Sequence, residues 1–435
     1  MFNATFDRPD LTTFTGLDGL GLVALGQRIE ADRAVIACEP TGSDQVCHRC
    51  GQVGVVRDTL TRRLAHVPFG WRPTVLLVRV HRYRCPDCKR VWRQDMSAAA
   101  EPRACLSRAG LRWGLEGIVV AHLSMARVAE GLGVAWNTAN DAVLAEGQRV
   151  LLADPGRFDG VKVIGVDEHV WRHTRNGDRF VTVIIDLTPV RDRAGPARLL
   201  DMVPGRSGKV FKTWLQARPA SWRDGIEVVA MDGFTGFKTA AVQVLPQAVE
   251  VMDPFHVVRL AGDALEDCRQ RIQRQTLGRR GRRTDPLFNA RRTLLTGQDL
   301  MTAHQWDRIG RLFTPLGHAP VEATWGVYQQ LVAAYRHPDP TQGKKLLASV
   351  IRSLSTGVPP GLPEIRRLGS TLKRRAVDIL AYFDKIGTSN GPTEAINGRL
   401  EHLRGTALGF RNLTNYIARS LLETGGFRPQ LHPRL

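Results

Sequence analysis

The stretch Val163-Ile164-Gly165-Val166-Asp167-Glu168 is an apolar run that ends in two carboxylates. A short, continuously apolar run is typical of a buried strand, and sheets of mixed strands and helices hold their functional groups where such strands end. The run therefore predicts a central strand, and Asp167 at its end is a candidate ligand for a divalent metal. A single acid at this position is also compatible with a simpler role, the capping of a neighbouring loop.

Strands and helices are predicted to alternate after this run. Apolar runs and helical periodicity place strands at 161–166, 180–186, 197–203, 226–232 and 248–253, and helices at 209–217 and 237–245. Three antiparallel strands followed by alternating helix and strand is the order of the RNase H-like fold. Asp186, Asp232 and Asp253 each end one of the later strands, so several acids compete for a role at the same sheet.

A third acid is predicted at the start of a helix near the C-terminus. Residues 257–385 are helical in pattern and basic, and after them Ser389 or Asn390 is suited to cap a helix. Glu394 then lies near the positive end of the helix dipole, which favours an ionised carboxylate. Glu401, two turns further on nearly the same face, is the alternative for this third position.

Asp167, Asp232 and Glu394 together match the needs of phosphodiester chemistry with two metal ions. Such chemistry requires carboxylates that converge on ions about 4 Å apart. Asp167 and Asp232 end strands that are neighbours in an RNase H-like sheet, and Glu394 approaches from a packed helix. We therefore expect Mg²⁺ or Mn²⁺ at this site. Glu168 points to the opposite face of its strand and is not expected to be a ligand.

Four of the seven cysteines form two closely spaced pairs, Cys47-His48-Arg49-Cys50 and Cys85-Pro86-Asp87-Cys88. Each pair lets two thiolates on one tight turn hold the same ion, and two such turns complete the closed tetrahedral site of structural zinc. The sequence therefore predicts Zn²⁺ bound by Cys47, Cys50, Cys85 and Cys88. The alternative is four reduced cysteines without a metal.

A basic strand is predicted to lead into the second cysteine pair. Residues 75–84 run apolar and then alternate, and they carry Arg79, Arg82 and Arg84. The whole chain has a net charge of +19, mostly from arginine, which favours a polyanionic partner because binding releases condensed counterions. Nucleic acid is the commonest such partner. Solubility alone is the simpler explanation of the charge.

Residues 124–143 resemble a helix-turn-helix. Ala129 allows two helices to cross closely, Gly133 makes the turn, and the second helix begins near Asn137 or Thr138. Asn137, Thr138 and Asn140 are then candidates to contact base edges or phosphates. The second helix carries Asp141 and Glu146 and no lysine or arginine, so a purely structural helical hairpin is the alternative.

The length of 435 residues predicts several domains in a multidomain α+β protein. We expect a zinc-binding domain at 1–96, a helix-turn-helix domain at 97–155, the first part of an RNase H-like core at 156–256, an all-helical insertion at 257–385, and the glutamate helix with a C-terminal tail at 386–435. No run approaches the about 18 apolar residues of a membrane span, and no signal peptide is recognisable. A cytoplasmic protein without a membrane partner is therefore expected.

At these residues the sequence resembles a known family, the bacterial insertion-sequence transposases of the DDE type called ISL-three. The resemblance covers most of the chain and is most specific at Asp253-Pro254-Phe255-His256 and at residues 389–397, Ser-Asn-Gly-Pro-Thr-Glu-Ala-Ile-Asn. It implies a core interrupted by a helical insertion, with Asp167, Asp232 and Glu394 catalytic. Asp253 and His256 match the Asp-x-x-His motif of several transposase groups, which implies an accessory role for them. Asn397, in the second stretch, is also counted as accessory.

The resemblance further implies binding to double-stranded DNA at the terminal inverted repeats of an insertion sequence, strand cleavage, and transfer of the freed 3′-hydroxyl to target DNA. It implies a homo-oligomer, at least a dimer on DNA, associated with the bacterial nucleoid. Two other functions stay open. One is a DNA-binding protein derived from a transposase that has lost its chemistry, and the other is an RNase H-like nuclease without strand transfer.

Overall fold

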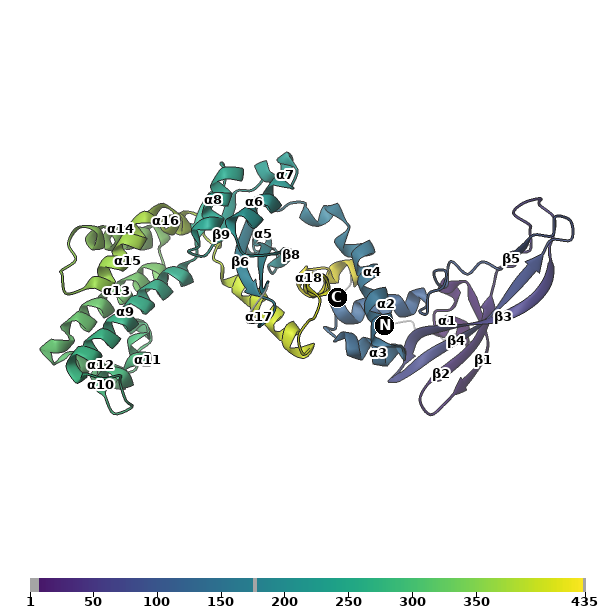
Figure 1. The fold of residues 1–435 in the computed structure, drawn as a ribbon, viewed down its shortest axis with the longest axis horizontal. Coiled ribbons are helices and arrows are strands. Elements are labelled where there is room, and N and C mark those ends of the chain that lie inside the picture. The colour runs from purple at the N-terminus through teal and green to yellow at the C-terminus, as the bar shows by residue number, and fades with distance from the viewer. Residues whose placement is uncertain (1–7, 175–177, 433–435) are drawn as a thin grey trace, which may run out of the picture. The chain divides into compact units, whose positions relative to one another are not determined.

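The computed structural model describes residues 8–174 and 178–432, and its contacts divide the chain into two compact units. Unit 1 comprises Met1–Arg157 and Leu403–Leu435, and unit 2 comprises Phe158–His402. Figure 1 shows the elements of both. The finer division into five domains stays a prediction. Among the described residues, no helix is both long and apolar enough to cross a membrane.

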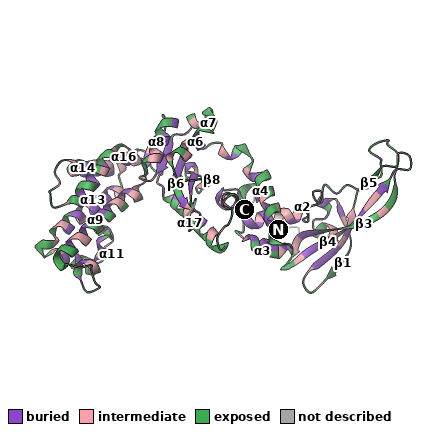
Figure 2. Ribbon diagram, viewed as in Figure 1, coloured by how far each residue is buried: buried purple, intermediate pink, exposed green. Residues whose placement is uncertain are grey.

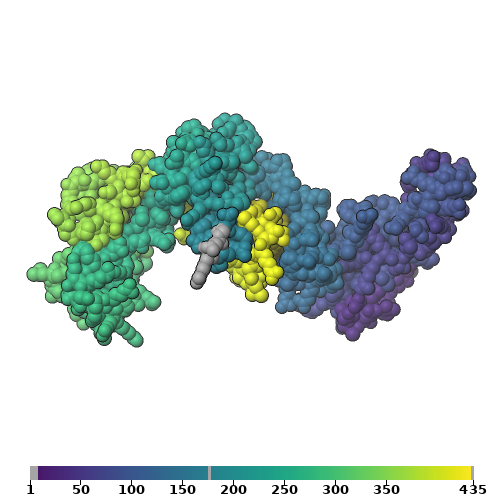
Figure 3. Space-filling view, in the orientation of Figure 1, coloured from purple at the N-terminus to yellow at the C-terminus, as the bar shows by residue number. Residues whose placement is uncertain are grey.

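Unit 1 begins with a five-stranded sheet. Its order is β1-β2-β4-β3, and β5 pairs with β4 beyond this path. The predicted strand at 75–84 is confirmed as part of β4, whose residues Leu76 and Val78 are fully buried. The end of the long β3–β4 ribbon that carries β5 forms a narrow projecting lobe (Figure 3). The elements are α1 (Leu11–Phe14), η1 (Asp18–Leu20), β1 (Leu22–Ile29), β2 (Ala34–Pro40), β3 (Val55–Phe69), β4 (Arg72–Arg84) and β5 (Val91–Arg93).

A small helical core completes unit 1. Ser124 caps α3 and Gly133 ends it with a φ of 63°, a conformation that glycine adopts without strain. The next helix, α4, starts at Trp136, slightly before the expected position. Leu422 of α18 packs into the same core. The elements are α2 (Arg108–Val119), α3 (Met125–Leu132), α4 (Trp136–Gly147), η2 (Gln148–Leu152), η3 (Pro155–Phe158), α18 (Leu413–Thr424) and α19 (Arg428–Leu431).

Unit 2 contains the second sheet, of order β10-β9-β6-β7-β8. The strand β6 pairs antiparallel with β7 and parallel with β9, and β9 pairs parallel with β10. Figure 2 shows the strands of this sheet as largely buried, which explains their continuously apolar sequences. The elements are β6 (Val163–Val170), β7 (Phe180–Asp186), α5 (Thr188–Arg191), β8 (Arg198–Pro204), α6 (Gly208–Gln216), α7 (Ala220–Asp224), β9 (Val228–Met231), α8 (Thr235–Val244) and β10 (Val249–Met252).

The strand β6 is longer than its apolar run. It continues past Asp167 and Glu168 to Val170, because these residues still pair with β7. Its pairing with β9 stops at Val166, opposite Met231. Asp167 therefore lies where the strand loses one of its two neighbours, and not at the end of the strand.

The expected helical segment is present between β10 and the last helix of unit 2. Its helices share one core that includes Leu265, Leu331 and Leu347. The elements are α9 (Pro254–Leu277), α10 (Pro286–Asn289), α11 (Arg291–Leu294), η4 (Gln298–Leu300), α12 (Ala303–Phe313), η5 (Leu316–His318), α13 (Ala319–Arg336), α14 (Pro340–Thr356), α15 (Pro363–Arg374), α16 (Ala376–Asp384) and, after them, α17 (Gly391–Thr406).

Candidate functional site

Three aspartates follow paired residues on three adjacent parallel strands. Val166 of β6 pairs with Met231 of β9, and Met231 pairs with Met252 of β10. The next residues along the chain are Asp167, Asp232 and Asp253. The register of the sheet therefore aligns these acids in one row across β6, β9 and β10.

The helix α17 packs on the face of β6 that carries Asp167. Residues 165 and 167 share one face of the strand, and residues 393 and 397 share one face of the helix. A Cβ on Gly165 would lie 2.7 Å from Thr393 Oγ1, so only glycine allows this approach. Two residues along the strand, Asn397 Nδ2 donates to Asp167 Oδ2 at 2.9 Å. The same helix carries Glu394 in its first turn.

Asp167 is a half-buried acid with other acids close to it. The pKa of Asp167 is raised to about 7, first by burial of the carboxyl and then by the charges of Asp232, Glu168 and Glu394. The backbone N–H of Glu168, at 2.8 Å from Asp167 Oδ1, acts in the opposite direction. These acids therefore repel one another in the absence of a cation, and an ion between them would remove that cost.

Glu394 is solvent-exposed and also has a raised pKa. Partial desolvation of its carboxyl is the first cause and the charge of Asp253 the second, while Arg259 lowers the pKa. In the described part of the chain, the three acids Asp167, Asp232 and Glu394 do not converge as closely as the ligands of a single ion, whose donor atoms would all lie within 4.8 Å.

Both carboxylate oxygens of Asp253 accept hydrogen bonds from backbone N–H groups. One of its oxygens accepts from the N–H of His256 at 3.1 Å and caps α9. The other accepts from the N–H of Asn390 at 2.8 Å. Asp253 is 3% exposed, and burial raises its pKa. The carboxylate thus ties the residue before α17 to the end of β10.

His256 lies beside the turn that follows Asp232. A Cβ on Gly233 would be 2.5 Å from His256 Nε2. Within the turn, Phe234 N–H donates to Asp232 Oδ1 at 2.8 Å. His256 therefore packs against Gly233, the residue that follows Asp232.

Sequence reasoning missed a buried ion cluster at the same turn. Arg375 donates through Nη1 to the carbonyl of Gly233 at 3.0 Å and through Nε to Asp378 at 2.6 Å. Lys238 Nζ of α8 donates to both oxygens of Asp378, at 2.7 and 2.9 Å. In the sequence, Arg375 belongs to the run Lys373-Arg374-Arg375, which resembles a solvated or DNA-facing cluster, and nothing in that run distinguishes its last residue.

The four paired cysteines form a second cluster, in unit 1. In the described residues, Cys47, Cys50, Cys85 and Cys88 have ligand atoms that all lie within 4.8 Å of one another. The sulfurs of Cys47 and Cys88 are 3.5 Å apart, and those of Cys50 and Cys85 are 3.4 Å apart. Backbone N–H groups, that of Arg49 first, lower the pKa of Cys47 to about 6. Four converging thiols of this kind fit a tetrahedral zinc ion.

The predicted DNA-contacting residues differ in how accessible they are. Arg79 and Arg84 are exposed, whereas Arg82 pairs with Asp58 through two hydrogen bonds. On α4, Asn137 is exposed and Thr138 is half-buried. Asn140 is only 4% exposed, and its side chain donates to Asp141 at 3.1 Å.

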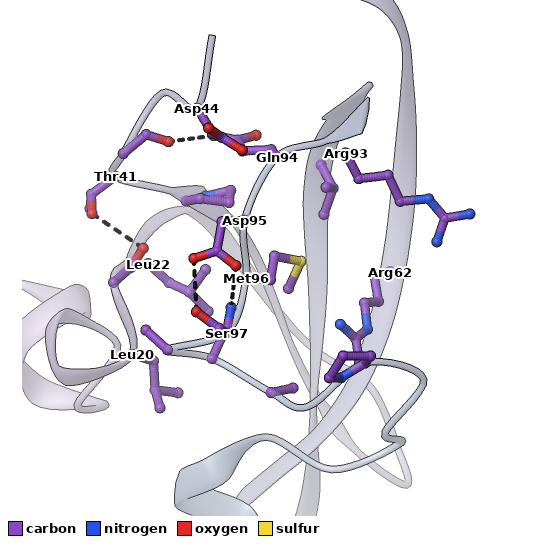
Figure 4. A pocket seen from close by; sticks show the side chains of 18 of the residues that line it. Leu20, Leu22, Thr41, Asp44, Arg62, Arg93, Gln94, Asp95, Met96 and Ser97 are labelled. Carbon is purple, nitrogen blue, oxygen red and sulfur yellow. Dashed lines mark hydrogen bonds between the residues drawn. The ribbon is translucent and has the colours of Figure 1, made fainter. Parts of the chain in front are cut away.

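Unit 1 also contains a large cavity, of about 1190 Å³, beside β3 and β4. Figure 4 shows part of its lining, in which Asp95 accepts from the backbone and hydroxyl of Ser97. Gln94 donates to the carbonyl of Gly42, and Arg62 to the carbonyls of Glu101 and Ala104. These polar side chains serve the fold around the cavity, so we assign no chemistry to it.

Known proteins are similar to this chain over most of its length. Transposases of the insertion sequence element IS1557 from two strains of Mycobacterium tuberculosis, CDC 1551 / Oshkosh and H37Rv, are each 25% identical over 72% of this chain and 72% of their own. The transposase of element IS1001 from Bordetella parapertussis is 23% identical over 70% of this chain and 72% of its own.

A solved structure, the Drosophila P element transposase strand transfer complex, aligns with 71% of this chain and 90% of its own at 10% identity. Its TM-score is 0.36, and no conclusion rests on it. The family model described as Transposase, for DDE enzymes of the ISL3 (ISL-three) type, matches residues 164–420, which include all three aspartates of the row and the helix α17. The chain therefore belongs to the ISL3 family of DDE transposases, a family of DNA-processing enzymes.

Proposed function

We propose that this chain is an active transposase that binds the terminal inverted repeats of an insertion sequence, cleaves DNA strands with two metal ions, and transfers the 3′-hydroxyl ends to target DNA. One observation carries the proposal. Asp167 and Asp232 follow paired residues on adjacent parallel strands, and α17, which packs on β6, carries Glu394 near enough for its charge to raise the pKa of Asp167.

The core around these residues is of the RNase H-like type. Its support is the strand order β10-β9-β6-β7-β8, in which three consecutive antiparallel strands are extended on the β6 side by two parallel ones. The helices α9 to α16 then form an insertion between β10 and the helix of Glu394. The proposal keeps the predicted division of this part of the chain into 156–256, 257–385 and the start of 386–435.

Asp167, Asp232 and Glu394 would hold Mg²⁺ or Mn²⁺. Their oxygen donors suit these hard cations, and the pKa of Asp167, raised first by burial and then by the charges of the neighbouring acids, fits a site that favours positive charge. Bound there, two ions would activate the attacking water or 3′-hydroxyl and stabilise the leaving oxygen. Asn397 holds the Asp167 carboxylate by its hydrogen bond, so the ligand presents its oxygens in a fixed orientation.

Unit 1 supplies DNA binding in this proposal. The four cysteines would hold a structural zinc at the end of the β3–β4 ribbon, next to the exposed Arg84. The helices α3 and α4, joined at Gly133, would act as a helix-turn-helix with Asn137 and Thr138 toward DNA. The buried Asn140 is better suited to stabilise α4 than to reach a base.

A cleavage assay on the DNA flanking the gene tests the proposal. The full chain is incubated with a duplex that carries the terminal repeat, with and without Mg²⁺, and then with a plasmid target. We expect metal-dependent nicking at the repeat and joined products, and loss of both by about a thousandfold or more in Asp167→Asn. Glu168→Gln is the matched control, because Glu168 is the neighbouring acid that pairs with Arg206 at 3.5 Å.

The other two functions give different results in this assay. Binding of the repeat without nicking, unchanged in Asp167→Asn, identifies a DNA-binding protein without chemistry. Nicking without joined product identifies a nuclease. Two copies of the chain on paired ends are expected for a transposase, and light scattering of the DNA complex measures this number.

A further inference from the structure

The helical insertion contacts the turn that presents Asp232. Arg375 lies between α15 and α16, and it donates to the carbonyl of Gly233, the residue directly after Asp232. Arg375 and Asp378 are 4% and 1% exposed, so this contact is inside the protein and not on a DNA-facing surface. A buried charge pair that also holds a backbone carbonyl restricts the position of both elements that it joins.

The turn after Asp232 is held on three sides. Its own N–H at Phe234 binds Asp232 Oδ1, His256 packs against Gly233, and Arg375 binds the Gly233 carbonyl from the insertion. The Asp232 carboxylate takes its orientation from this turn, because one of its oxygens is bound within it. Displacement of the Gly233 carbonyl would therefore move the carboxylate.

Arg375 is itself fixed by an ion network with α8. Asp378 accepts from Arg375 Nε and from Lys238 Nζ, so one carboxylate joins the insertion to the helix that follows the turn. Lys238 is in the first turn of α8, which begins three residues after Asp232. The network thus spans the segment from Gly233 to Lys238 and holds both of its ends.

We propose that Arg375, supported by Asp378 and Lys238, is a positioning residue that orients Asp232 for metal binding, so the helical insertion is required for the metal site itself. This proposal rests on the proposed function, in which Asp232 is a ligand. It assigns to the insertion a role that does not depend on contact with DNA.

The test measures metal affinity as well as cleavage. In the full chain, Arg375→Met removes the donors at nearly constant length, and Arg375→Lys keeps the charge but cannot reach both partners with a planar fork. Arg271→Met is the matched control, because Arg271 forms a comparable ion pair with Glu364 at 2.7 Å between α9 and α15 of the same insertion. Each variant is assayed for terminal-repeat cleavage over a range of Mg²⁺ concentrations, for Mn²⁺ binding by calorimetry, and for thermal unfolding.

For Arg375→Met we expect the Mg²⁺ concentration at half-maximal cleavage to rise by about tenfold or more, and Mn²⁺ binding to weaken in parallel. High metal concentration should restore much of the rate. Arg375→Lys should lie between Arg375→Met and the unchanged protein, and Arg271→Met should keep its metal dependence within about twofold. If Arg375→Met does not fold, Arg375→Lys carries the same comparison.

The proposal is overturned if Arg375→Met and Arg271→Met lose similar thermal stability while the metal dependence of cleavage and Mn²⁺ binding stay unchanged in both. Failure of the proposed function gives a different pattern. In that case the unchanged protein neither cleaves the repeat nor binds Mn²⁺ in a manner that Asp167→Asn abolishes.

Discussion

His66 gives the stability of unit 1 a defined dependence on pH. The ring is buried, its Nε2 lies 3.2 Å from the carbonyl of Thr15, and its Nδ1 lies 2.8 Å from Ser107 Oγ. Ser107 also caps α2 through Gly110 N–H, so its hydroxyl hydrogen is free to donate to Nδ1. Burial lowers the pKa of His66, which means that the folded state holds the neutral ring.

An imidazole with a lowered pKa binds fewer protons in the folded state than in the unfolded state. Its contribution to stability is therefore present above the unfolded value of about 6.5 and is lost as the pH falls below it. We expect the Tm of unit 1 to fall between pH 8 and pH 5. His66→Gln should be less stable at pH 8 but should show a smaller change over this range, which calorimetry at the two pH values measures.

The absence of a side chain at Gly165 allows α17, the helix that carries Glu394, to pack closely on β6. In Gly165→Ala, the new Cβ would meet Thr393 Oγ1 at 2.7 Å and Asn390 Oδ1 at 3.2 Å, and both of these side chains are buried. Such overpacking costs about 1–3 kcal/mol, and the helix must shift to relieve it. We expect cleavage to fall by at least about tenfold while repeat binding is retained.

Binding is followed by a gel-shift assay of the same preparation, and Gly310→Ala, which has open space around its Cβ position, is the control. Normal cleavage by Gly165→Ala would contradict the placement of Glu394 by this contact.

The positions of several acids in the sheet were predictable, because each of these acids follows an apolar run in the sequence. Acids after apolar runs predicted Asp167, Asp232 and Asp253 as candidates, and the structure aligns them in one row. The sequence contained no sign that Asp253 also accepts from the N–H of Asn390, because Asn390 is 137 residues away. For the same reason Arg375 was not distinguishable from the two basic residues before it.

At the scale of the elements, the zinc site predicted at the two cysteine turns can be tested directly. We expect one zinc per chain in the purified protein, and loss of it in Cys85→Ser. Because the metal stabilises the folded lobe, its removal should lower the Tm of unit 1 by about 5 °C or more. Cys105→Ser is the matched control, since this cysteine is exposed and outside the cluster. Elemental analysis showing no zinc in the unchanged protein would leave four reduced cysteines as the explanation.

Two arginines of β4 differ in how freely they can contact DNA, a difference that the sequence does not show. Arg79 is exposed, while Arg82 is held by Asp58. We expect Arg79→Gln to reduce the slope of log affinity against log salt by about 0.9, the value for one lost phosphate contact. Arg82→Gln should change that slope less, because its charge is already partly neutralised. Repeat binding at several salt concentrations distinguishes the two variants.

Element positions followed closely from the pattern in the sequence. The strand expected at 180–186 is β7, and that at 226–232 contains β9. The predicted end of β6 was wrong. A continuously apolar run indicates a strand that is buried on both faces. Beyond this run β6 continues to Val170, paired with β7 on one side only. Pairing with β7 is a tertiary contact that local periodicity does not contain.

At the scale of the whole molecule, the two units have separate cores and separate candidate metals. We expect two thermal transitions, of which a zinc chelator lowers only the one from unit 1. Arg271→Met should lower only the transition temperature of unit 2, which contains Arg271. Differential scanning calorimetry resolves the two, and one transition that shifts as a whole under both changes would show that the units unfold together.

The row of acids across β6, β9 and β10 also sets a limit on how this protein can vary. Neighbouring strands lie about 4.8 Å apart, close to the about 4 Å between two catalytic ions. The hydrogen-bond ladder between β6 and β9 therefore sets the spacing of the backbones that carry Asp167 and Asp232, and the turn after β9 orients the Asp232 carboxylate. Substitutions in the hydrophobic core are tolerable at this site as long as the register of β6 and β9 is kept, but insertion or deletion of a single residue within β9 would turn Asp232 to the opposite face.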